Sequence, residues 1–188
     1  MNRNRTLTYI LIGATVVLAA VIAFFLLRGI NARTPSREDG GNASSRFTIF
    51  DDRTKAPDIE FAGLDGAAYR LSDFRGKTVV INFWAVFCPP CVDELPDFDR
   101  AVPVLAEMNT VVIALNVTEP AGEIIRFIEQ MKITNLDFYL DVAGNSSKTY
   151  GIDTIPRTII IDADGYIRAA ARGAVTYNDL VNTVGDMR

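Results

Sequence analysis

The segment from Thr78 to Cys91 constrains the fold of this chain more than any other. Its first part, up to Trp84, is a continuous apolar run that is rich in β-branched residues apart from Asn82. Such runs are typical of strands that are buried on both faces. A Cys-Pro-Pro-Cys sequence begins at Cys88, and proline is favoured at the first positions of a helix. We therefore expect a buried strand that leads directly into a helix with two thiols in its first turn.

The rest of the chain continues to alternate strand patterns with helix patterns. The remaining elements with these patterns are strands at 110–117 and 157–162, and helices after Cys91, at 121–132 and at 176–187. Two Asp-Gly dipeptides, at Asp65 and at Asp164, favour tight hairpin turns. Together these patterns predict an α/β fold with a mixed central sheet, flanked by helices and finished by an antiparallel hairpin.

Both cysteines of the chain lie in the one motif, and the chain has no histidine. Structural zinc needs four ligands, usually Cys and His, so one chain cannot supply the expected set. Three interpretations stay open: a redox-active dithiol, a copper(I) site made of two thiolates, and an inert pair. The start of a helix favours the first, because the N–H groups and the dipole there stabilise a thiolate. Cys88 would then attack a partner disulfide, and Cys91 would resolve the mixed disulfide.

An uncharged apolar stretch runs from Thr6 to Leu27, between Arg5 and Arg28. Roughly 20 apolar residues are enough to span the bilayer core as a helix. The stretch ends without a small-residue cleavage site, which favours an uncleaved anchor over a signal peptide. We expect three parts, which are a transmembrane anchor at 1–30, a flexible tether at 31–45 and a globular domain at 46–188.

The orientation of the anchor is less strongly indicated than its presence. The arginines on its two sides are nearly equal in number, so the positive-inside rule decides little. A short basic N-terminus before a first hydrophobic segment still favours a cytoplasmic N-terminus. We expect the anchor to contact membrane lipid. A formal net charge of −4 argues against nucleic acid as a partner. No cofactor is predicted.

The motifs resemble those of thioredoxin-fold proteins. A Phe-Trp-Ala sequence precedes the cysteine pair, Pro96 follows it, and a loop ending in Ile155-Pro156 comes just before the strand at 157–162. The resemblance implies that Pro156 follows a cis peptide bond and packs against the sulfurs. It also implies that the backbone of Ile155 pairs with an extended partner peptide. We expect Trp84 to pack beside the active site, and we place it with Ile155 and Pro156 among the substrate-binding residues.

A narrower resemblance is to membrane-anchored thiol:disulfide oxidoreductases of the TlpA/ResA/CcmG type. It rests on the N-terminal anchor, the lead-in from Ala56 to Lys77, the Cys-Pro-Pro-Cys motif and the Glu94-Leu-Pro sequence after it. It implies a helix–strand insert at 121–139. It further implies a bacterial cell-membrane protein whose periplasmic or extracytoplasmic domain reduces specific protein disulfides. The partners implied are apocytochrome c or copper-site proteins of cytochrome oxidase, with electrons supplied by a membrane thiol relay.

Asn82 occupies the strand position where thioredoxins have a buried aspartate that accepts the proton of the resolving cysteine. An amide cannot act as that base. The TlpA/ResA-like group tends to have asparagine there and an acid three residues after the second cysteine, which is Glu94 in this chain. Residues three apart share a helix face, so we hypothesise that Glu94 buffers the proton of Cys91. The alternative is an ordinary acid in the first turns of a helix.

Other activities fit the sequence less well. A disulfide-forming oxidase also uses a CxxC pair, but the Pro-Pro sequence between the cysteines and the tether favour a reductant. A copper(I) metallochaperone could use the same thiols, but the related carriers have a distant histidine, which this chain lacks. A peroxiredoxin is disfavoured because Val86 and Phe87 provide no hydroxyl group before the first cysteine. The identity of the partner and the direction of electron flow stay open.

Overall fold

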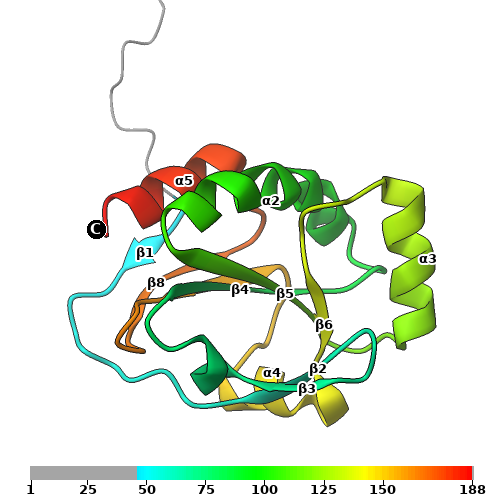
Figure 1. Ribbon diagram of the computed structural model, residues 1–188, viewed down its shortest axis with the longest axis horizontal. Helices are drawn as coiled ribbons and strands as arrows, with labels where there is room; N and C mark the ends of the chain where they lie inside the picture. Colours follow the sequence, from blue (N-terminus) through cyan, green and yellow to red (C-terminus); the bar gives the residue numbers. More distant parts are fainter. Residues whose placement is uncertain (1–45, 188) are drawn as a thin grey trace, which may run out of the picture. The chain divides into compact units, whose positions relative to one another are not determined.

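The apolar run that ends at Trp84 forms a central strand of an eight-stranded sheet. The computed structural model describes residues 46–187. In this range the strand order is β1-β8-β7-β4-β5-β6-β2-β3 (Figure 1). The strands are β1 (Thr48–Ile49), β2 (Glu60–Gly63), β3 (Ala68–Arg70), β4 (Thr78–Trp84), β5 (Thr110–Asn116), β6 (Phe138–Leu140), β7 (Arg157–Ile161) and β8 (Ile167–Arg172).

The sheet is mixed, as the sequence predicts. Strands β4, β5 and β6 run parallel to one another, whereas β7, β8, β1 and the β2–β3 hairpin are antiparallel to their neighbours. β4 and β5 are paired along their whole length, from Thr78 opposite Thr110 to Trp84 opposite Asn116. The segments that follow Trp84 and Asn116 therefore leave the sheet at the same edge, and the cysteine motif lies there.

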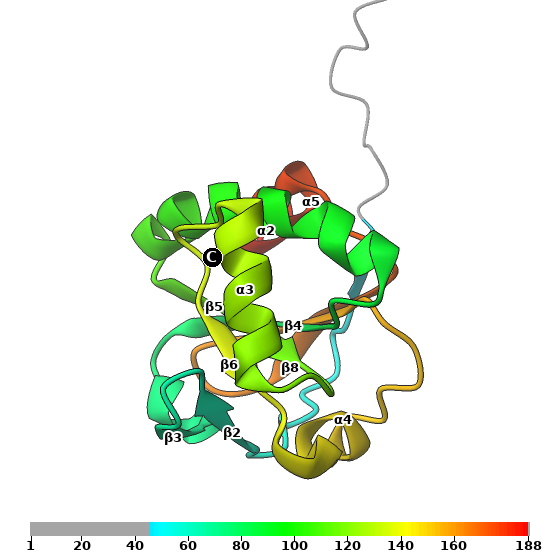
Figure 2. The same ribbon diagram turned by 90° about the vertical axis from the view of Figure 1, so that its right-hand side faces the viewer.

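Helical segments cover both faces of the sheet (Figures 1 and 2). α2 and α5 lie side by side over one face, whereas η1 and the segment around α4 lie over the other. The helical elements are η1 (Leu71–Phe74), α2 (Pro89–Glu107), α3 (Ala121–Met131), η2 (Val142–Gly144), α4 (Asn145–Thr149) and α5 (Tyr177–Gly185), where η marks a 3-10 helix. The thioredoxin-like α/β architecture predicted from the sequence is confirmed.

The side chains of β4 divide the core into two layers. Val80 and Trp84 belong to the cluster beneath α2 and α5, whereas Ile81 and Phe83 belong to the cluster on the opposite face. None of the four is exposed to solvent. This is the burial on both faces that the uninterrupted apolar run predicts. The alternation also places Asn82, between Val80 and Trp84, on the face that α2 covers.

The helix predicted at 121–132 is present as α3, but it is less buried than its apolar pattern suggests. Only Ile124 is fully buried, while Ile125 and Met131 are 42% and 36% exposed. α3 lies at one end of the described domain rather than over the middle of the sheet (Figures 1 and 2). A helix in that position contacts the core along a narrow line. With β6, α3 forms the helix–strand insert that the resemblance implies.

Two short elements, β1 and α4, are absent from the sequence-based prediction. They have two and five residues, which is too short for a hydrophobic period to appear. β1 nevertheless extends the sheet by pairing with β8. The predicted hairpin turns at Asp65 and Asp164 are both present, joining β2 to β3 and β7 to β8, and the glycine of each turn has a positive φ.

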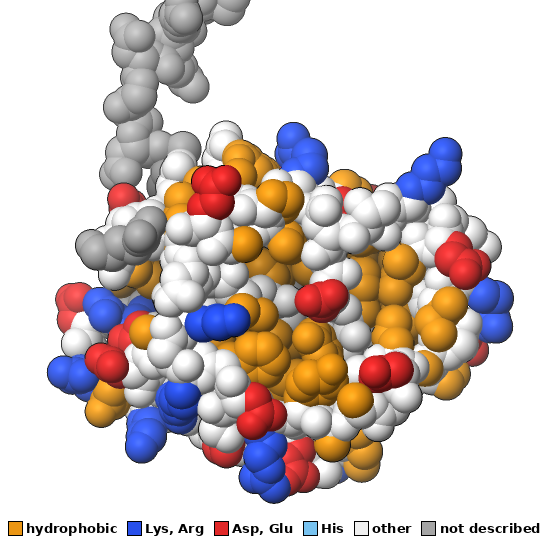
Figure 3. All heavy atoms as spheres, in the orientation of Figure 1, with side chains coloured by type: hydrophobic (Ala, Val, Ile, Leu, Met, Phe, Trp, Pro, Cys, Tyr) orange, Lys and Arg blue, Asp and Glu red, His pale blue; other side chains and the backbone are white. Residues whose placement is uncertain are grey.

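Some large hydrophobic side chains lie on the surface. On the face seen in Figure 3 they gather near the centre, with acidic and basic side chains around them. Within residues 46–187, the most exposed large hydrophobic side chain is that of Phe87, at 68%. Since Phe87 directly precedes Cys88, its exposure bears on the cysteine site.

The predicted anchor at 1–30 and tether at 31–45 lie outside the described residues. Among residues 46–187, no helix combines the length and the apolarity needed to cross a membrane. The division of the chain into anchor, tether and domain therefore stays a prediction.

Candidate active site

The two cysteines form a disulfide bond at the start of α2, with an S–S distance of 2.11 Å. Cys88 is the N-cap residue in an extended conformation, and Pro89 and Pro90 occupy the first helical positions. Their missing N–H groups cost little there, because the first turn has no acceptor for them. The predicted strand-to-helix junction with both thiols in the first turn is confirmed.

The two sulfur-bearing residues differ in their access to solvent. Cys88 is 7% exposed, whereas Cys91 is not exposed at all. The positive end of the α2 dipole favours a thiolate at Cys88. A partner can therefore reach Cys88 alone, and Cys91 can react only inside the protein. The predicted roles of attacking and resolving thiols require this asymmetry.

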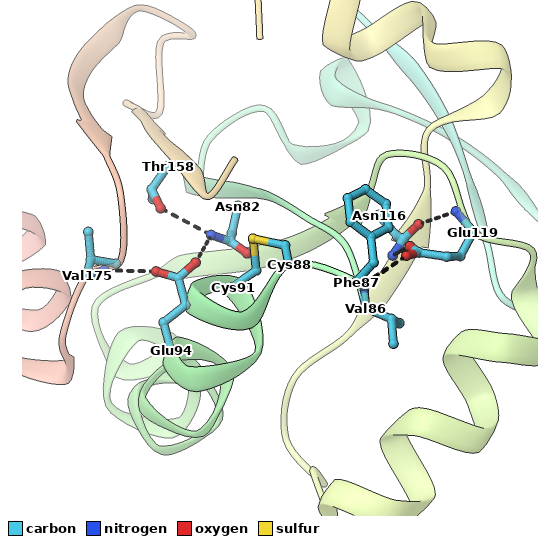
Figure 4. The surroundings of a disulfide bond; sticks show 10 residues. All are labelled: Asn82, Val86, Phe87, Cys88, Cys91, Glu94, Asn116, Glu119, Thr158 and Val175. Atoms are coloured by element: carbon cyan, nitrogen blue, oxygen red, sulfur yellow. Dashed lines mark hydrogen bonds between the residues drawn. A yellow bond between two sulfur atoms is a disulfide. The ribbon is translucent and has the colours of Figure 1, made fainter. Parts of the chain in front are cut away.

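Glu94 lies in the core, one helical turn after Cys91, and only 3% of it is exposed. Its Oε1 accepts a hydrogen bond from Nδ2 of Asn82 at 2.8 Å, and its Oε2 accepts the backbone N–H of Val175 at 2.8 Å (Figure 4). Burial raises the pKa of Glu94 from 4.5 to about 7, although both hydrogen bonds act in the opposite direction. Such a carboxyl group changes its protonation near neutral pH, as a proton acceptor for Cys91 must. The role of Glu94 itself stays a prediction.

Asn82 is fully buried beneath the first turns of α2. Besides the bond to Glu94, its Nδ2 donates to Oγ1 of Thr158 on β7 at 3.2 Å. Both N–H groups of the amide are thus in use. Among residues 46–187, its Oδ1 has no hydrogen-bond partner. Asn82 orients Glu94, and as an amide it cannot take a proton in place of the carboxylate.

The loop before β7 has the features that the resemblance implies. The Ile155–Pro156 peptide bond is cis, and Pro156 is buried. Ile155 is only partly buried, and no hydrogen bond joins its backbone to another residue of the range 46–187. That backbone is available to an extended peptide. The substrate-binding roles of Ile155 and Pro156 stay predictions.

An open groove lies next to Phe87, the residue before the attacking cysteine. Its volume is about 740 Å³, and Phe87 and Val117 line it together with parts of η2 and α4 and the loop at 151–155. Most of the lining is apolar, while Lys148 and Asp153 add one charge of each sign. The groove extends from Phe87, which precedes Cys88, to Ile155, which precedes the cis-proline. It can therefore hold a chain segment that follows a cysteine.

The structure corrects the prediction that Trp84 binds substrate. The Trp84 side chain is completely buried, and its ring packs against those of Phe127 and Phe138, with centroids 5.5 and 5.3 Å apart. The α3–β6 insert supplies both of these rings and covers the indole. Trp84 supports the site from inside and has no surface to offer a partner.

Sequence reasoning missed Glu119, which holds the residues before Cys88. Its Oε1 accepts the backbone N–H groups of Val86 at 2.9 Å and of Phe87 at 3.3 Å, and its Oε2 accepts from Nδ2 of Asn116 at 2.6 Å (Figure 4). Asn116 Oδ1 in turn accepts the backbone N–H of Glu119 at 2.8 Å. The sequence does contain a signal for this network, which is the polar pair Asn116 and Glu119 at the end of β5 and just after it. Because β4 and β5 are parallel, both strands end at the same edge of the sheet, and this pair therefore lies near the residues before Cys88.

Sequence reasoning also undervalued Phe87, which entered only as a residue that provides no hydroxyl group before the first cysteine. Its high exposure beside the groove makes it a candidate contact for a partner. An apolar residue directly before the attacking cysteine is a signal that the sequence does contain.

The chain was compared with known protein families. The profile of the AhpC/TSA family matches residues 53–170. The chain belongs to the AhpC/TSA family. The matched range includes both cysteines, Glu94 and the Ile155–Pro156 loop, but not Val175, whose backbone binds Glu94.

Relatives of this AhpC/TSA-family protein carry the name thiol-disulfide oxidoreductase ResA. The ResA of Geobacillus thermodenitrificans (strain NG80-2) is 32% identical over 125 residues, which are 66% of this chain and 71% of that relative. The ResA of Bacillus cereus (strain ATCC 10987 / NRS 248) is 28% identical over 180 residues, which are 96% of this chain and 95% of that relative. This protein is a thiol:disulfide oxidoreductase of the TlpA/ResA/CcmG-like group, and its reaction is the exchange of protein thiols and disulfides.

Solved structures show the same fold as this AhpC/TSA-family protein. The exposed lipoprotein thioredoxin Etrx1 of Streptococcus pneumoniae strain TIGR4 has a TM-score of 0.62 and 28% identity, and the match covers 69% of this chain and 99% of that one. A thiol:disulfide interchange protein DsbE from Chlorobium tepidum has a TM-score of 0.64 and 24% identity, with coverages of 73% and 97%. At 24% identity, the similarity to the second structure supports only the shared fold.

Proposed function

We propose that this protein is a membrane-anchored, extracytoplasmic reductant of disulfide bonds in specific partner proteins. The observation that carries the proposal is the contrast between its two sulfurs. Cys88 is 7% exposed and directly follows Phe87, which lines an open groove, whereas Cys91 is fully buried one turn from a carboxyl group whose pKa is raised to about 7. A dithiol arranged in this way attacks one accessible sulfur and then releases the partner from inside.

The exchange has two steps. In the reduced protein, the Cys88 thiolate attacks one sulfur of the partner disulfide; the partner S–S bond breaks and its other sulfur leaves as a thiolate. Cys91 then attacks the Cys88 sulfur in the mixed disulfide, which breaks as the Cys88–Cys91 bond forms. Two electrons pass to the partner, whose second sulfur leaves as a thiolate and takes up a proton. The disulfide described above is the product state of this protein.

Glu94 acts in the second step. Cys91 must lose a proton before it can attack, and it is sealed from solvent. The Glu94 carboxylate lies one helical turn along the same face of α2, where it can accept that proton directly or through a water molecule. A pKa of about 7 lets Glu94 release the proton again at neutral pH.

The partner segment occupies the groove in an extended conformation. The unpaired backbone of Ile155 offers hydrogen bonds to such a segment, and Phe87 and Ile152 offer apolar contacts within the groove. Main-chain pairing of this kind supplies affinity, and pockets for side chains supply specificity. The partner classes that the resemblance implies are apocytochrome c and copper-site proteins of cytochrome oxidase.

The location of the protein is part of the proposal. The apolar stretch at 6–27 supports a single-pass anchor in the bacterial cell membrane, and the basic N-terminus supports a cytoplasmic N-terminus. The domain would then lie where protein disulfides persist, outside the cytoplasm. A membrane thiol relay returns the Cys88–Cys91 pair to the dithiol state after each turnover.

Trapping tests the partner and the location together. In the Cys91→Ala variant, the first step proceeds and the second cannot, so membranes of cells that make this variant should yield a partner joined covalently to Cys88. Cys88→Ala is the matched control and should trap nothing. In the same Cys91→Ala cells, a thiol reagent that does not cross membranes should label the Cys88 thiol of those molecules that are not joined to a partner. A variant that traps no protein and binds copper(I) tightly would support the metallochaperone instead, and a Cys88 protected from the reagent would contradict the location.

A further inference from the structure

One buried oxygen atom of the site lacks a partner. Oδ1 of Asn82 is sealed from solvent and accepts no hydrogen bond from any residue of the range 46–187. An acceptor buried in this way costs about 1–3 kcal/mol, and folded proteins contain few of them. Both N–H groups of the same amide, in contrast, donate hydrogen bonds. In the disulfide state, this oxygen therefore has no protein donor among residues 46–187.

The orientation of the amide follows from its partners. Nδ2 donates to Oε1 of Glu94 at 2.8 Å and to Oγ1 of Thr158 at 3.2 Å. The other carboxylate oxygen of Glu94 accepts a backbone N–H, so the carboxylate serves as the acceptor on both sides. The amide must present its nitrogen to Glu94. Its oxygen is consequently turned away from the acid.

The oxygen lies on the side of the amide that faces the start of α2 (Figure 4). In Figure 4 the amide oxygen of Asn82 points toward Cys91. The two residues are both completely buried, and Cys91 shares a face of α2 with Glu94, which contacts the same amide. In the disulfide, Cys91 has no hydrogen to donate. Reduction changes this, because a thiol is a hydrogen-bond donor.

We propose that Oδ1 of Asn82 accepts a hydrogen bond from the Cys91 thiol in the reduced protein, and that this bond favours the dithiol over the disulfide. The proposal rests on the disulfide exchange assigned to Cys88 and Cys91. Reduction of that bond takes two electrons and two protons, which the reducing dithiol supplies as it becomes a disulfide. One proton is then found on Cys91 and fills the acceptor that was empty.

This arrangement gives Asn82 a double contact. Its oxygen holds the thiol of Cys91, and its nitrogen holds the carboxylate of Glu94. An aspartate at position 82 could take the Cys91 proton but would face Glu94 with a second negative charge. The amide avoids that repulsion and leaves proton transfer to Glu94. Asn82 thereby sets the stability of the reduced state, whereas Glu94 sets the rate at which Cys91 loses its proton.

A redox titration of the full chain in detergent micelles against glutathione tests the thermodynamic part. Asn82→Leu keeps the approximate shape of the side chain and removes the acceptor, so the equilibrium should move toward the disulfide by about 10-fold, which is about 30 mV for a two-electron couple. Thr158→Val is the matched control, because it removes the other partner of Nδ2 and leaves Oδ1 in place. Its equilibrium should stay within about twofold of that of the parent.

An infrared measurement tests the bond itself. A Cys88→Ser chain has a single thiol, on Cys91, and the S–H stretching band of that thiol should lie at lower frequency in the folded chain than in the same chain unfolded by guanidinium. This comparison needs no change at Asn82, so it stands even if Asn82→Leu does not fold. An unshifted band would overturn the proposal, and so would an unchanged glutathione equilibrium in Asn82→Leu. A parent pair that exchanges with neither glutathione nor the stronger reductant dithiothreitol would instead overturn the disulfide exchange.

Discussion

Oε2 of Glu94 accepts the backbone N–H of Val175 at 2.8 Å, although 81 positions of the chain separate the two residues. Val175 lies just before α5, so this bond ties the first turns of α2 to the neighbouring helix. It also explains how a carboxyl group can be held in an apolar core. Each of its oxygens has a donor, and the remaining cost of burial raises its pKa to about 7.

The first prediction concerns proton transfer. Glu94→Gln removes the proton acceptor, so the rate at which the reduced protein resolves a mixed disulfide should fall by about 100-fold at pH 8. In the parent, this rate should rise with pH through about 7 as Glu94 ionises, and the variant should lack that rise. Stopped-flow measurement of exchange with a peptide disulfide between pH 5 and 9 checks both. Glu107→Gln, on the exposed end of the same helix, is the control. Identical pH profiles for parent and Glu94→Gln would contradict the role of Glu94.

The second prediction concerns stability. The pKa of Glu94 is higher in the folded protein than its ordinary value of 4.5. Its contribution to stability is therefore fully present below about pH 4.5 and is lost as pH rises through about 7. Relative to Glu94→Gln, the free energy of unfolding of the parent should fall by up to roughly 3 kcal/mol between pH 4 and pH 8. Guanidinium unfolding of both chains with the disulfide intact measures the difference. A difference that does not change with pH would show that burial leaves the acid unperturbed.

The third prediction concerns the network before Cys88. Glu119→Ala leaves the N–H groups of Val86 and Phe87 without their acceptor, so hydrogen exchange of these two amides should accelerate by about 10-fold. The amides of β4 should keep their protection, because the strand ladder does not involve Glu119. Glu123→Ala is the control, since that residue is an exposed acid nearby on α3. Equal protection of Val86 and Phe87 in both variants would mean that the carboxylate does not hold this segment.

The fourth prediction concerns partner contact. Phe87→Ser removes an exposed side chain, so the free energy of unfolding should change by no more than about 0.5 kcal/mol. Exchange with a peptide disulfide should slow by about 10-fold, because burying an aromatic ring in a groove stabilises a complex by at least about 1.5 kcal/mol. Exchange with hydroxyethyl disulfide, which is too small to fill the groove, should stay the same. Ile125→Ser, an exposed apolar residue on α3, should affect neither reaction. If both disulfides slow equally in Phe87→Ser, the residue acts on Cys88 rather than on the partner.

The sequence predicts those parts of the fold where one pattern extends over many residues. The run at 78–84 and the run at 110–117 are uninterrupted, and both strands begin and end within one residue of the predicted bounds. The placement of both thiols at a helix start follows from Pro89 and Pro90. The cis bond before Pro156 follows only from the resemblance, since spacing alone says nothing of the isomer.

The rest depends on contacts between distant segments. An acid in the first turns of a helix is ordinarily exposed. The burial and pairing of Glu94 become visible only through its contacts with Asn82 on β4 and with Val175 just before α5. The role of Glu119 requires the register of two parallel strands. Trp84 looks accessible in the sequence because it stands near the cysteines, but the rings that cover it come from an insert more than 40 residues later.

The burial of Cys88 sets a limit on when the protein can act. Only 7% of this residue is exposed, and the groove lined by the neighbouring Phe87 has a volume of about 740 Å³. A finished domain seldom offers a disulfide on an extended segment, since its cysteines lie within packed elements. We expect reduction to compete with the folding of the partner, so that slow-folding chains are reduced completely and fast-folding chains escape. Selectivity would then depend on time as well as on complementarity.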